Sequence, residues 1–354
     1  MIKFVFTGDI MLAREIGKKL LDSNNIQIIS ERVSLILDEA DFCIGNLECP
    51  VSEIALPINS QGFRALPHSL NQIKKFDLLT LSNNHIFDCG KLGALDTINH
   101  IKLNNILFSG LLIDENSYIQ PIIKNVKGKN FAFFSCSVED CIKNQEDYFP
   151  KIIEATDNCL LDSIKKTCKN VDYSIVTVHG GNEMIPYPQP SFRKLCQTYI
   201  ENGADIVITT HPHVLGGYEK YNSGHIFYSL GDFIFDAESY LRRKCAILRI
   251  TICDQLRWEL IPTTITKNFE IILAEVNLRD SIAGKFDEIS KSLSSAKYEE
   301  IYPKLYKRSL AIYQIDRLKF KIQNKGFLHL FGFILSKLYL IPFYFKSIIK
   351  GSYK

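Results

Sequence analysis

The chain has 354 residues, of which 46% are apolar and 23% charged, and its formal net charge is +3. This composition is typical of a folded soluble protein and excludes a chain too poor in apolar residues to build a core. The length is sufficient for one large α/β domain with an appendage, or for two domains.

Cysteine usage and the N-terminal residues indicate the cellular compartment. The ten cysteines are scattered without a C-x-x-C pair, and several lie in apolar runs, where cysteine packs as a small hydrophobic residue. The first residues, MIKFVFTGDIMLAR, lack the basic start, long apolar stretch and small-residue cleavage site of a signal peptide. We therefore expect a cytoplasmic protein in a reducing compartment, without disulfides.

The first part of the chain alternates apolar strands with helices. The expected strands cover 3–7, 40–44, 76–81 and 106–108, and the expected helices cover 11–21 and 93–103. Polar residues follow the ends of the first three strands: Asp9, Asn46, Glu48, Asn84, His85 and Asp88. Arg14 lies in the first turns of the first helix. This repeating order of strand, polar strand end and helix is typical of an α/β architecture.

The second part continues the pattern around two β-branched runs. A hairpin is expected over 121–136, a polar and mostly helical stretch over 139–170, and antiparallel strands over 245–265. The runs at 173–178 and 204–210 are typical of buried parallel strands, with a helix between them. Polar residues again follow these strands and the next one: His179, Glu183, His211, His213 and Asp232.

The carboxyl ends of parallel strands line the crevice where ligands bind, so we expect these polar side chains to converge. A mixed set of carboxylate, amide and imidazole groups suits a divalent ion of the Mn, Fe or Zn kind. Such a set leaves positions open for water and substrate, as in a catalytic rather than a structural metal site.

Six motifs occur in the order seen in the CapA family of poly-γ-glutamate capsule synthesis proteins, which resembles the calcineurin-like metallophosphoesterases. They are Gly8-Asp9 with Arg14, Gly45-Asn46-Leu47-Glu48, Asn83-Asn84-His85-x-x-Asp88-x-Gly90, His179-Gly180-Gly181-x-Glu183, His211-Pro212-His213-Val214 and Tyr228-Ser229-Leu230-Gly231-Asp232-Phe233. The resemblance implies a four-layer αββα sandwich with one or two divalent metal ions at the strand ends.

Residue roles follow from the same resemblance. The metal ligands that it implies are Asp9, Asn46 or Glu48, Asn84, His179, His211 and His213. The residues that it implies around the reacting groups are His85, Asp88, Arg14 and Glu183, with His85 as general acid or transition-state donor. The sequence departs from the metallophosphoesterase pattern at Met11, where a histidine is usual, and at the bridging position, where Asn46 or Glu48 stands in place of aspartate. These departures leave the number of ions open.

Several of these residues also have a purely structural interpretation. Glu48 could satisfy free N–H groups at a helix start, and Arg14 could form a salt bridge instead of binding an anionic substrate. Asp88 could orient His85 or a bound water, or be a turn residue. Asp232, in a Gly-Asp pair after a strand, is also typical of a turn.

The C-terminal part needs its own explanation. Residues 302–354 carry eleven Lys or Arg and one acid, a net charge of +10, so that residues 1–301 are at −7. We divide the chain into a main domain at 1–268, a helical extension at 269–325 and a basic, aromatic-rich segment at 326–354. The last segment fits either a helix lying in a membrane interface or a helix packed on the main domain.

Two functions are compatible with the sequence. The first is a metal-dependent hydrolase acting on an anionic or polymeric substrate in capsule or surface-polymer synthesis, peripherally bound at the inner face of the cell membrane. The second is a non-catalytic component that binds the polymer, or that assembles with polymer-synthase proteins for export. No nucleic-acid recognition motif accompanies the basic charge, so we do not expect a nucleic-acid partner.

Deletion of residues 326–354 tests the membrane interpretation. If this segment lies in the membrane interface, its removal should shift the protein from the membrane fraction to the soluble fraction, because the aromatic and basic anchor is lost. Fractionation of cells that express either form measures the shift. An unchanged distribution would contradict membrane anchoring and favour a packed helix.

Overall fold

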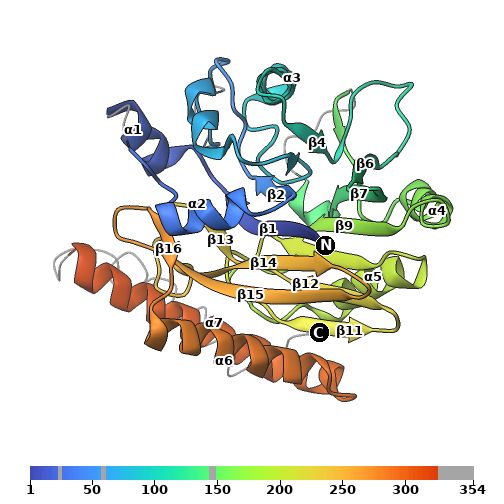
Figure 1. Cartoon of the computed structure of the whole chain (residues 1–354). Coiled ribbons are helices and arrows are strands. Elements are labelled where there is room, and N and C mark those ends of the chain that lie inside the picture. The colour runs from blue at the N-terminus through green and yellow to red at the C-terminus, as the bar shows by residue number, and fades with distance from the viewer. Residues whose placement is uncertain (23–25, 57–60, 143–148, 326–354) are drawn as a thin grey trace, which may run out of the picture.

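This computed structural model describes residues 1–22, 26–56, 61–142 and 149–325, and the predicted segment 326–354 lies outside the described residues. Two β-sheets pack face to face and helices cover both outer faces, which confirms the predicted four-layer αββα sandwich (Figure 1). None of the described helices is long and apolar enough to cross a membrane.

The larger sheet has the strand order β16-β15-β14-β1-β2-β3-β4, and β13 also pairs with β1. Its strands are β1 (Ile2–Ile10), β2 (Phe42–Leu47), β3 (Leu78–Thr80), β4 (Leu107–Ser109), β13 (Asp232–Ile234), β14 (Lys244–Ile252), β15 (Leu256–Ile265) and β16 (Ile271–Leu273). Strands β1, β2, β3 and β4 are parallel, so their carboxyl ends meet at one edge.

The second sheet has the order β11-β12-β10-β9-β7-β6. Its strands are β6 (Ile122–Val126), β7 (Lys129–Ser137), β9 (Tyr173–His179), β10 (Ile206–Thr210), β11 (Tyr218–Tyr221) and β12 (Gly224–Tyr228). Strands β6 and β7 form the predicted hairpin, and β7, β9, β10 and β12 run parallel. A separate pair joins β5 (Leu111–Leu112) to β8 (Lys151–Ile152).

The interface between the sheets is built largely from aromatic side chains. Alternate residues of β1 face opposite layers: Phe4 and Phe6 pack between the sheets, while Val5 packs under the outer helices. The ring centroids of Phe42 and Phe133, one from each sheet, lie 5.1 Å apart. This apolar contact holds the two sheets together and fixes how their strand ends face each other.

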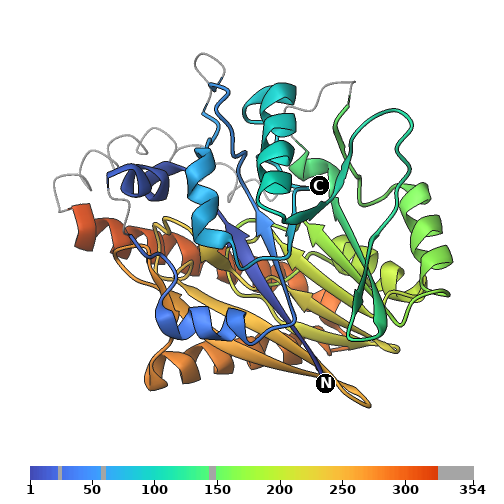
Figure 2. The same ribbon diagram turned by 45° about the horizontal axis from the view of Figure 1, so that its top comes forward.

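Helices close the outer faces. The larger sheet is covered by α1 (Arg14–Asp22), α2 (Glu31–Asp38), α3 (Gly90–Leu103) and the 3-10 helix η1 (Pro67–Ile73). The second sheet is covered by α4 (Asn158–Thr167), α5 (Pro190–Glu201) and α7 (Tyr298–Lys325), while α6 (Val276–Leu293) packs on β11 of the second sheet and β15 of the larger sheet. Helices α6 and α7 run along the lower side of the molecule in Figure 1, and Figure 2 shows the same arrangement tilted forward. They confirm the predicted helical C-terminal region.

The prediction of a mostly helical stretch at 139–170 was right only in part. Its described residues form the short 3-10 helix η2 (Glu139–Cys141), strand β8 and the ten-residue helix α4. The chain is extended around Ile153, whose carbonyl accepts the Ser137 N–H at 2.9 Å and whose own N–H donates to the Gly110 carbonyl at 3.1 Å. These long-range hydrogen bonds across the strand ends override the local polarity of the stretch.

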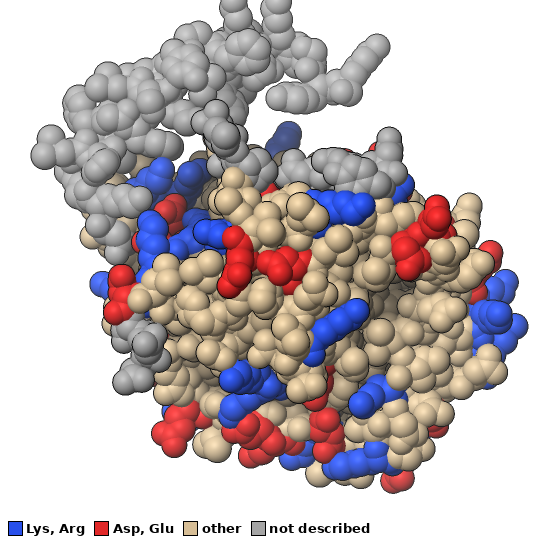
Figure 3. All heavy atoms as spheres, turned by 90° about the horizontal axis from the view of Figure 1, so that it is seen from above, with Lys and Arg blue, Asp and Glu red and all other residues tan. Residues whose placement is uncertain are grey.

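The exposed charges are intermixed on the face seen from above. Figure 3 shows Lys and Arg beside Asp and Glu over a largely uncharged surface, where the described residues are visible. The acidic residues that matter most for the site are buried, as described below.

Replacing Phe133 with alanine tests the inter-sheet contact. Phe133 is 2% exposed and packs on Phe42 and Phe4, so F133A should lower the free energy of unfolding by about 3–5 kcal/mol. Chemical denaturation measures the change. Ile123→Ala on the paired strand is the control, since Ile123 is 58% exposed and its truncation should change stability by no more than about 0.5 kcal/mol. Equal effects of the two variants would contradict the assignment of the core.

Candidate metal centre

Strand pairing brings the predicted polar residues to one edge of the sandwich. In the larger sheet, parallel pairing places Asp9 of β1 beside Asn46 of β2. In the second sheet, His179 at the end of β9 pairs with Thr210 at the end of β10. The His-Pro-His sequence therefore begins one residue beyond the position paired with His179. The two sets of strand ends face each other because the sheets are stacked.

The turn that carries the two last histidines has unusual backbone geometry. His211 has a φ of 97° and His213 a φ of 57°, both in the left-handed region that residues with a Cβ seldom adopt. Each such residue costs on the order of 1–3 kcal/mol. The turn is nevertheless held, because the His211 N–H donates a hydrogen bond to Asp9 Oδ2 at 3.2 Å.

Asp9 is a fully buried carboxylate that joins the two sheets. Its Oδ1 accepts a hydrogen bond from the Asn46 amide at 2.8 Å, and its Oδ2 lies 3.3 Å from His213 Nδ1. Burial by itself raises the pKa of Asp9, but hydrogen bonds from His213 and Asn46 outweigh it and hold the pKa below its ordinary value. Asp9 therefore remains an anion in the interior.

Glu48 provides the strongest indication of a cation-binding site. It is 0% exposed, and neither carboxylate oxygen has a hydrogen-bond partner among the described residues. Its Oε1 lies 3.6 Å from His213 Nε2 and 3.9 Å from His179 Nε2. Burial, reinforced by the charge of Asp9, raises the pKa of Glu48 far above its ordinary value. A buried carboxylate without donors is costly unless a cation neutralises it, so this donor set fits a divalent metal ion.

The geometry distinguishes Glu48 from Asn46, the other residue predicted at the bridging position. The Asn46 amide oxygen accepts hydrogen bonds from Thr80 Oγ1 at 3.1 Å and Asn83 Nδ2 at 3.3 Å, while its amide nitrogen donates to Asp9. Asn46 thus lies inside the cluster with its oxygen already engaged. Glu48 presents its Oε1 to the imidazoles of His213 and His179, and no helix-start N–H group accounts for it.

His213 lies between three acidic side chains. Its Nδ1 is 2.9 Å from Asp232 Oδ1, and the Arg242 Nε–H donates to Asp232 Oδ2 at 2.9 Å. Burial alone lowers the pKa of His213, but the negative charges of Glu48 and Asp232 outweigh it and raise the pKa to about 10. Asp232 is therefore part of the cluster as well as the residue after a turn.

Asn84 and His179 come from opposite sheets and meet in the cluster. The Asn84 side-chain oxygen lies 2.9 Å from His179 Nε2, while His179 Nδ1 lies 3.0 Å from the Thr210 hydroxyl. Both side chains are buried. A metal ion bound here would replace the Asn84–His179 hydrogen bond with two metal–ligand bonds.

His85 lies at the rim, and its ring is held from two sides. Its Nδ1 is 2.9 Å from Asp88 Oδ2, its Nε2 is 3.1 Å from Asn84 Nδ2, and its ring stacks obliquely on Phe63 at 4.5 Å. Asp88 also accepts the Phe63 N–H at 2.7 Å. The orienting role suggested for Asp88 therefore agrees with its position.

The two remaining predicted residues lie further out. Arg14 forms the ion pair that was one of its two interpretations, with its Nε 3.0 Å from Asp236 Oδ2, and its guanidinium lies over the rings of Phe63 and Phe235. It also starts α1 with a φ of 59°. Glu183 has an exposed side chain in the loop after β9. Their roles toward a substrate remain predictions.

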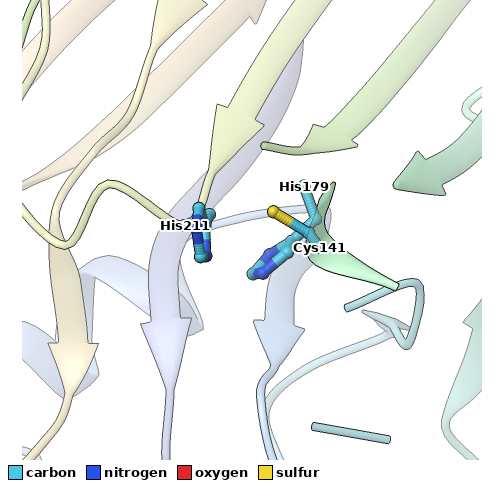
Figure 4. A group of neighbouring side chains, drawn as sticks. All are labelled: Cys141, His179 and His211. Carbon is cyan, nitrogen blue, oxygen red and sulfur yellow. The ribbon is translucent and has the colours of Figure 1, made fainter. Parts of the chain in front are cut away.

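Among the described residues, three groups of buried side chains offer ligand atoms within 4.8 Å of one another. They are Glu48 with His211 and His213, Asp9 with His213 and Asp232, and Cys141 with His179 and His211. Figure 4 shows the third group, in which the Cys141 sulfur and the two imidazoles approach each other from separate elements.

Sequence reasoning missed Cys141 and Arg242. Cys141 follows the end of β7, a strand that was correctly predicted, so the strand-end rule could have identified it. Arg242 lies in the connection between β13 and β14, outside every motif, and nothing in the local sequence signals its contact with Asp232.

The comparison with known families is decisive for the class of this chain. The model of the family described as bacterial capsule synthesis protein PGA_cap matches residues 3–237, the part that contains both sheets' site strands. The chain belongs to this family. The predicted membership in the CapA family is thereby confirmed.

Two curated members are similar to the chain. The capsule biosynthesis protein CapA of Bacillus anthracis is 29% identical over 261 residues, which are 70% of this chain and 62% of that protein. The PGA biosynthesis protein CapA of Bacillus subtilis is 30% identical over 258 residues, which are 69% of this chain and 66% of that protein. The match thus spans slightly under two thirds of each of these PGA_cap relatives.

Solved structures give more distant similarities. The NAD nucleotidase of Haemophilus influenzae has a TM-score of 0.45 at 12% identity, covering 87% of this chain and 60% of that one. The 5'-nucleotidase of Candida albicans has a TM-score of 0.45 at 13% identity, covering 87% and 56%.

The acid–base properties of the cluster predict the stability of the metal-free protein. Glu48 and His213 both have raised pKa values, so the folded state binds more protons than the unfolded state above their ordinary values of 4.5 and 6.5. Stability should therefore fall as the pH rises from 6.5 through about 10, by up to about 1.4 kcal/mol per pH unit for His213, and the raised pKa of Glu48 acts in the same direction.

Melting temperatures in the presence of a chelator, measured across that interval, provide the test. Added divalent metal should reverse the trend, because the ion replaces the protons as the neutralising charge. Glu48→Gln should flatten the chelator curve, since glutamine does not titrate and no longer raises the pKa of His213. A metal-free protein whose stability rises with pH would contradict this description.

Proposed function

We propose that the chain is a metal-dependent hydrolase that acts on an anionic substrate in the synthesis of a capsule or related surface polymer. The single observation that carries the proposal is the buried Glu48 carboxylate, which has no hydrogen-bond donor and faces His213 and His179. Such a group requires a cation, and the surrounding donors are those of a catalytic divalent site.

The ligands for one or two ions would come from both sheets. They would be Asp9, Glu48, Asn84, His179, His211 and His213. When bound, the ions would supply a polarised substrate oxygen and an activated water. Asn46 would hold Asp9 in place through its amide, and Asp232 would hold the His213 ring through Nδ1.

His85 would transfer a proton to or from the leaving group. Asp88 would accept a hydrogen bond from Nδ1, so Nε2, which lies 3.1 Å from Asn84 Nδ2, would be the nitrogen that takes up a proton and, once the ring is protonated, delivers it. The side chain is 19% exposed, so it lies where substrate and cluster would meet. The Phe63 ring limits its rotation.

The rim of the site supports an anionic substrate. Arg14 is 30% exposed and forms its ion pair with Asp236 through Nε, which leaves its terminal amino groups outside that contact. Stacking on Phe63 and Phe235 holds the guanidinium flat. A phosphoester or a carboxylate-bearing amide or ester would fit this charge. The name of the Bacillus subtilis relative, a PGA biosynthesis protein, is the basis for proposing a poly-γ-glutamate-like polymer. Polymer-synthase proteins and the inner membrane surface are further partners that we propose from the sequence alone.

A second function is favoured by one observation. Arg242 is buried and paired with Asp232, so one side of the acidic cluster already contains a fixed positive charge. Together with Met11 in place of the usual histidine, this suits a protein that has kept the fold to bind a polymer or to assist assembly and export without catalysis.

His85→Ala discriminates between the two functions. The variant should remain folded and metal-bound yet lose roughly 10²- to 10⁴-fold in turnover, because a positioned proton donor is removed. Activity would be measured on chromogenic aryl phosphoesters, carboxylic esters and γ-glutamyl anilides, and metal content by elemental analysis.

The matched control is His100→Ala. His100 also pairs with a nearby carboxylate, Asp96 at 3.3 Å, but on helix α3 away from the cluster, so turnover should not change. The His211→Ala/His213→Ala double variant should lose the metal. Full activity of H85A, or a parent protein that binds no divalent metal, would overturn catalysis and favour the assembly role.

A further inference from the structure

The group of Cys141, His179 and His211 lies where three neighbouring strands end. Strands β7, β9 and β10 are parallel and adjacent, with Ser137 paired to His179 and His179 paired to Thr210. The 3-10 turn after β7 returns the chain over these ends and places Cys141 beside the imidazoles (Figure 4). The order of the strands in the sheet therefore brings these three side chains together.

Short backbone contacts fix the turn that carries Cys141 to the His179 strand. The Val138 N–H donates to the His179 carbonyl at 3.1 Å, and the Cys141 N–H donates to the Val138 carbonyl at 2.9 Å. A Cβ at Gly180 would lie 2.8 Å from the Val138 side chain, so the close packing of the two segments depends on glycine. The sulfur thus has a defined position relative to the His179 ring.

The chemistry of this group differs from that of its neighbours. All three side chains are buried: Cys141 is 3%, His179 2% and His211 6% exposed. Their ligand atoms, one sulfur and two ring nitrogens, lie within 4.8 Å of one another. The other two groups contain carboxylates, whereas sulfur and imidazole together select zinc-like or ferrous ions over magnesium, calcium or manganese.

The remaining cysteines have different surroundings. Cys136 lies on β7, the strand before the turn that carries Cys141. Its sulfur contacts Thr177 and Tyr199, and burial raises its pKa to about 12. Cys159 and Cys253 are exposed. Among the described residues, Cys141 is the cysteine found in a group that could hold a metal ion.

We propose that Cys141 is a thiolate metal ligand, so that with His179 and His211 it forms a sulfur-containing position beside the carboxylate-rich one. On binding, the thiol loses its proton to solvent and the sulfur forms the bond to the ion, with no change of oxidation state. This inference rests on the proposed metal-dependent function and narrows it to an enzyme that works with a thiophilic ion at one position.

Cobalt(II) loading of the full-length chain is the test. To remove exposed thiols, the parent for spectroscopy carries Cys159→Ser and Cys253→Ser. The loaded parent should show a near-ultraviolet sulfur-to-cobalt charge-transfer band, and Zn²⁺ should displace the cobalt and abolish the band. Metal binding should also release one more proton from this parent than from the same protein with Cys141→Ser.

Cys141→Ser should remove the band while some cobalt remains on the carboxylate-rich side. It should weaken Zn²⁺ binding by more than the roughly 10- to 100-fold that loss of an outer-shell partner costs. The control is Cys136→Ser, which changes a buried cysteine of β7, the strand that precedes the turn with Cys141, and this variant should keep the band.

The outcomes separate the inference from the proposed function. Cobalt bound by the parent without a charge-transfer band, or a band that persists in C141S, overturns the role of Cys141 and leaves the metal-dependent function intact. A parent that binds no cobalt, zinc or manganese overturns both. The parent spectrum requires no substitution at Cys141. It therefore tests the inference even if the Cys141→Ser variant misfolds.

Discussion

The site depends on the contact that Asp9 makes across the sandwich. One carboxylate oxygen accepts the Asn46 amide of its own sheet, and the other accepts the His211 backbone N–H of the opposite sheet. The aromatic layer sets the separation of the sheets, and Asp9 sets how their strand ends align. A buried anion in this place would be unfavourable alone. The hydrogen-bond donors around Asp9 hold its carboxylate in place, and the other candidate ligands are positioned relative to it.

Charge balance explains the rest of the cluster. Glu48 and Asp232 add further buried carboxylates, and Arg242 with protonated His213 compensates part of that charge in the metal-free protein. Glu48 is the carboxyl group whose oxygens lack donors, and burial together with the charge of Asp9 raises its pKa, so that without an ion it is favoured in the protonated form. Asp88 and Asp236 differ, since each is paired with a positively charged or donor group at the rim. The demand for a cation is therefore localised in the interior, and the Arg14–Asp236 ion pair lies outside it.

The sequence predicted the parts of this arrangement that follow from strand ends. Apolar runs such as 173–178 and 204–210 identify strands, and parallel strands bring their following residues together, so Asp9, His179 and His211 could be predicted to converge. The choice between Asn46 and Glu48 could not be predicted, because it depends on where each side chain points across the sheet. Arg242 depends on a loop conformation, whereas Cys141 follows the end of a predicted strand, and its approach to His179 and His211 depends on the 3-10 turn after β7. Both are products of tertiary contact.

The family match and the folding unit do not coincide. The matched region ends at residue 237, yet β1, which carries Asp9, is paired along Ile2–Phe6 with β14 (Lys244–Ile252). Cutting the chain at the family boundary would leave the backbone of β1 unpaired along that edge, and an unpaired strand edge is a typical template for aggregation. The C-terminal strands thus complete the pairing of the central strand β1. The boundaries of the family match are therefore a poor guide to soluble fragments of this chain.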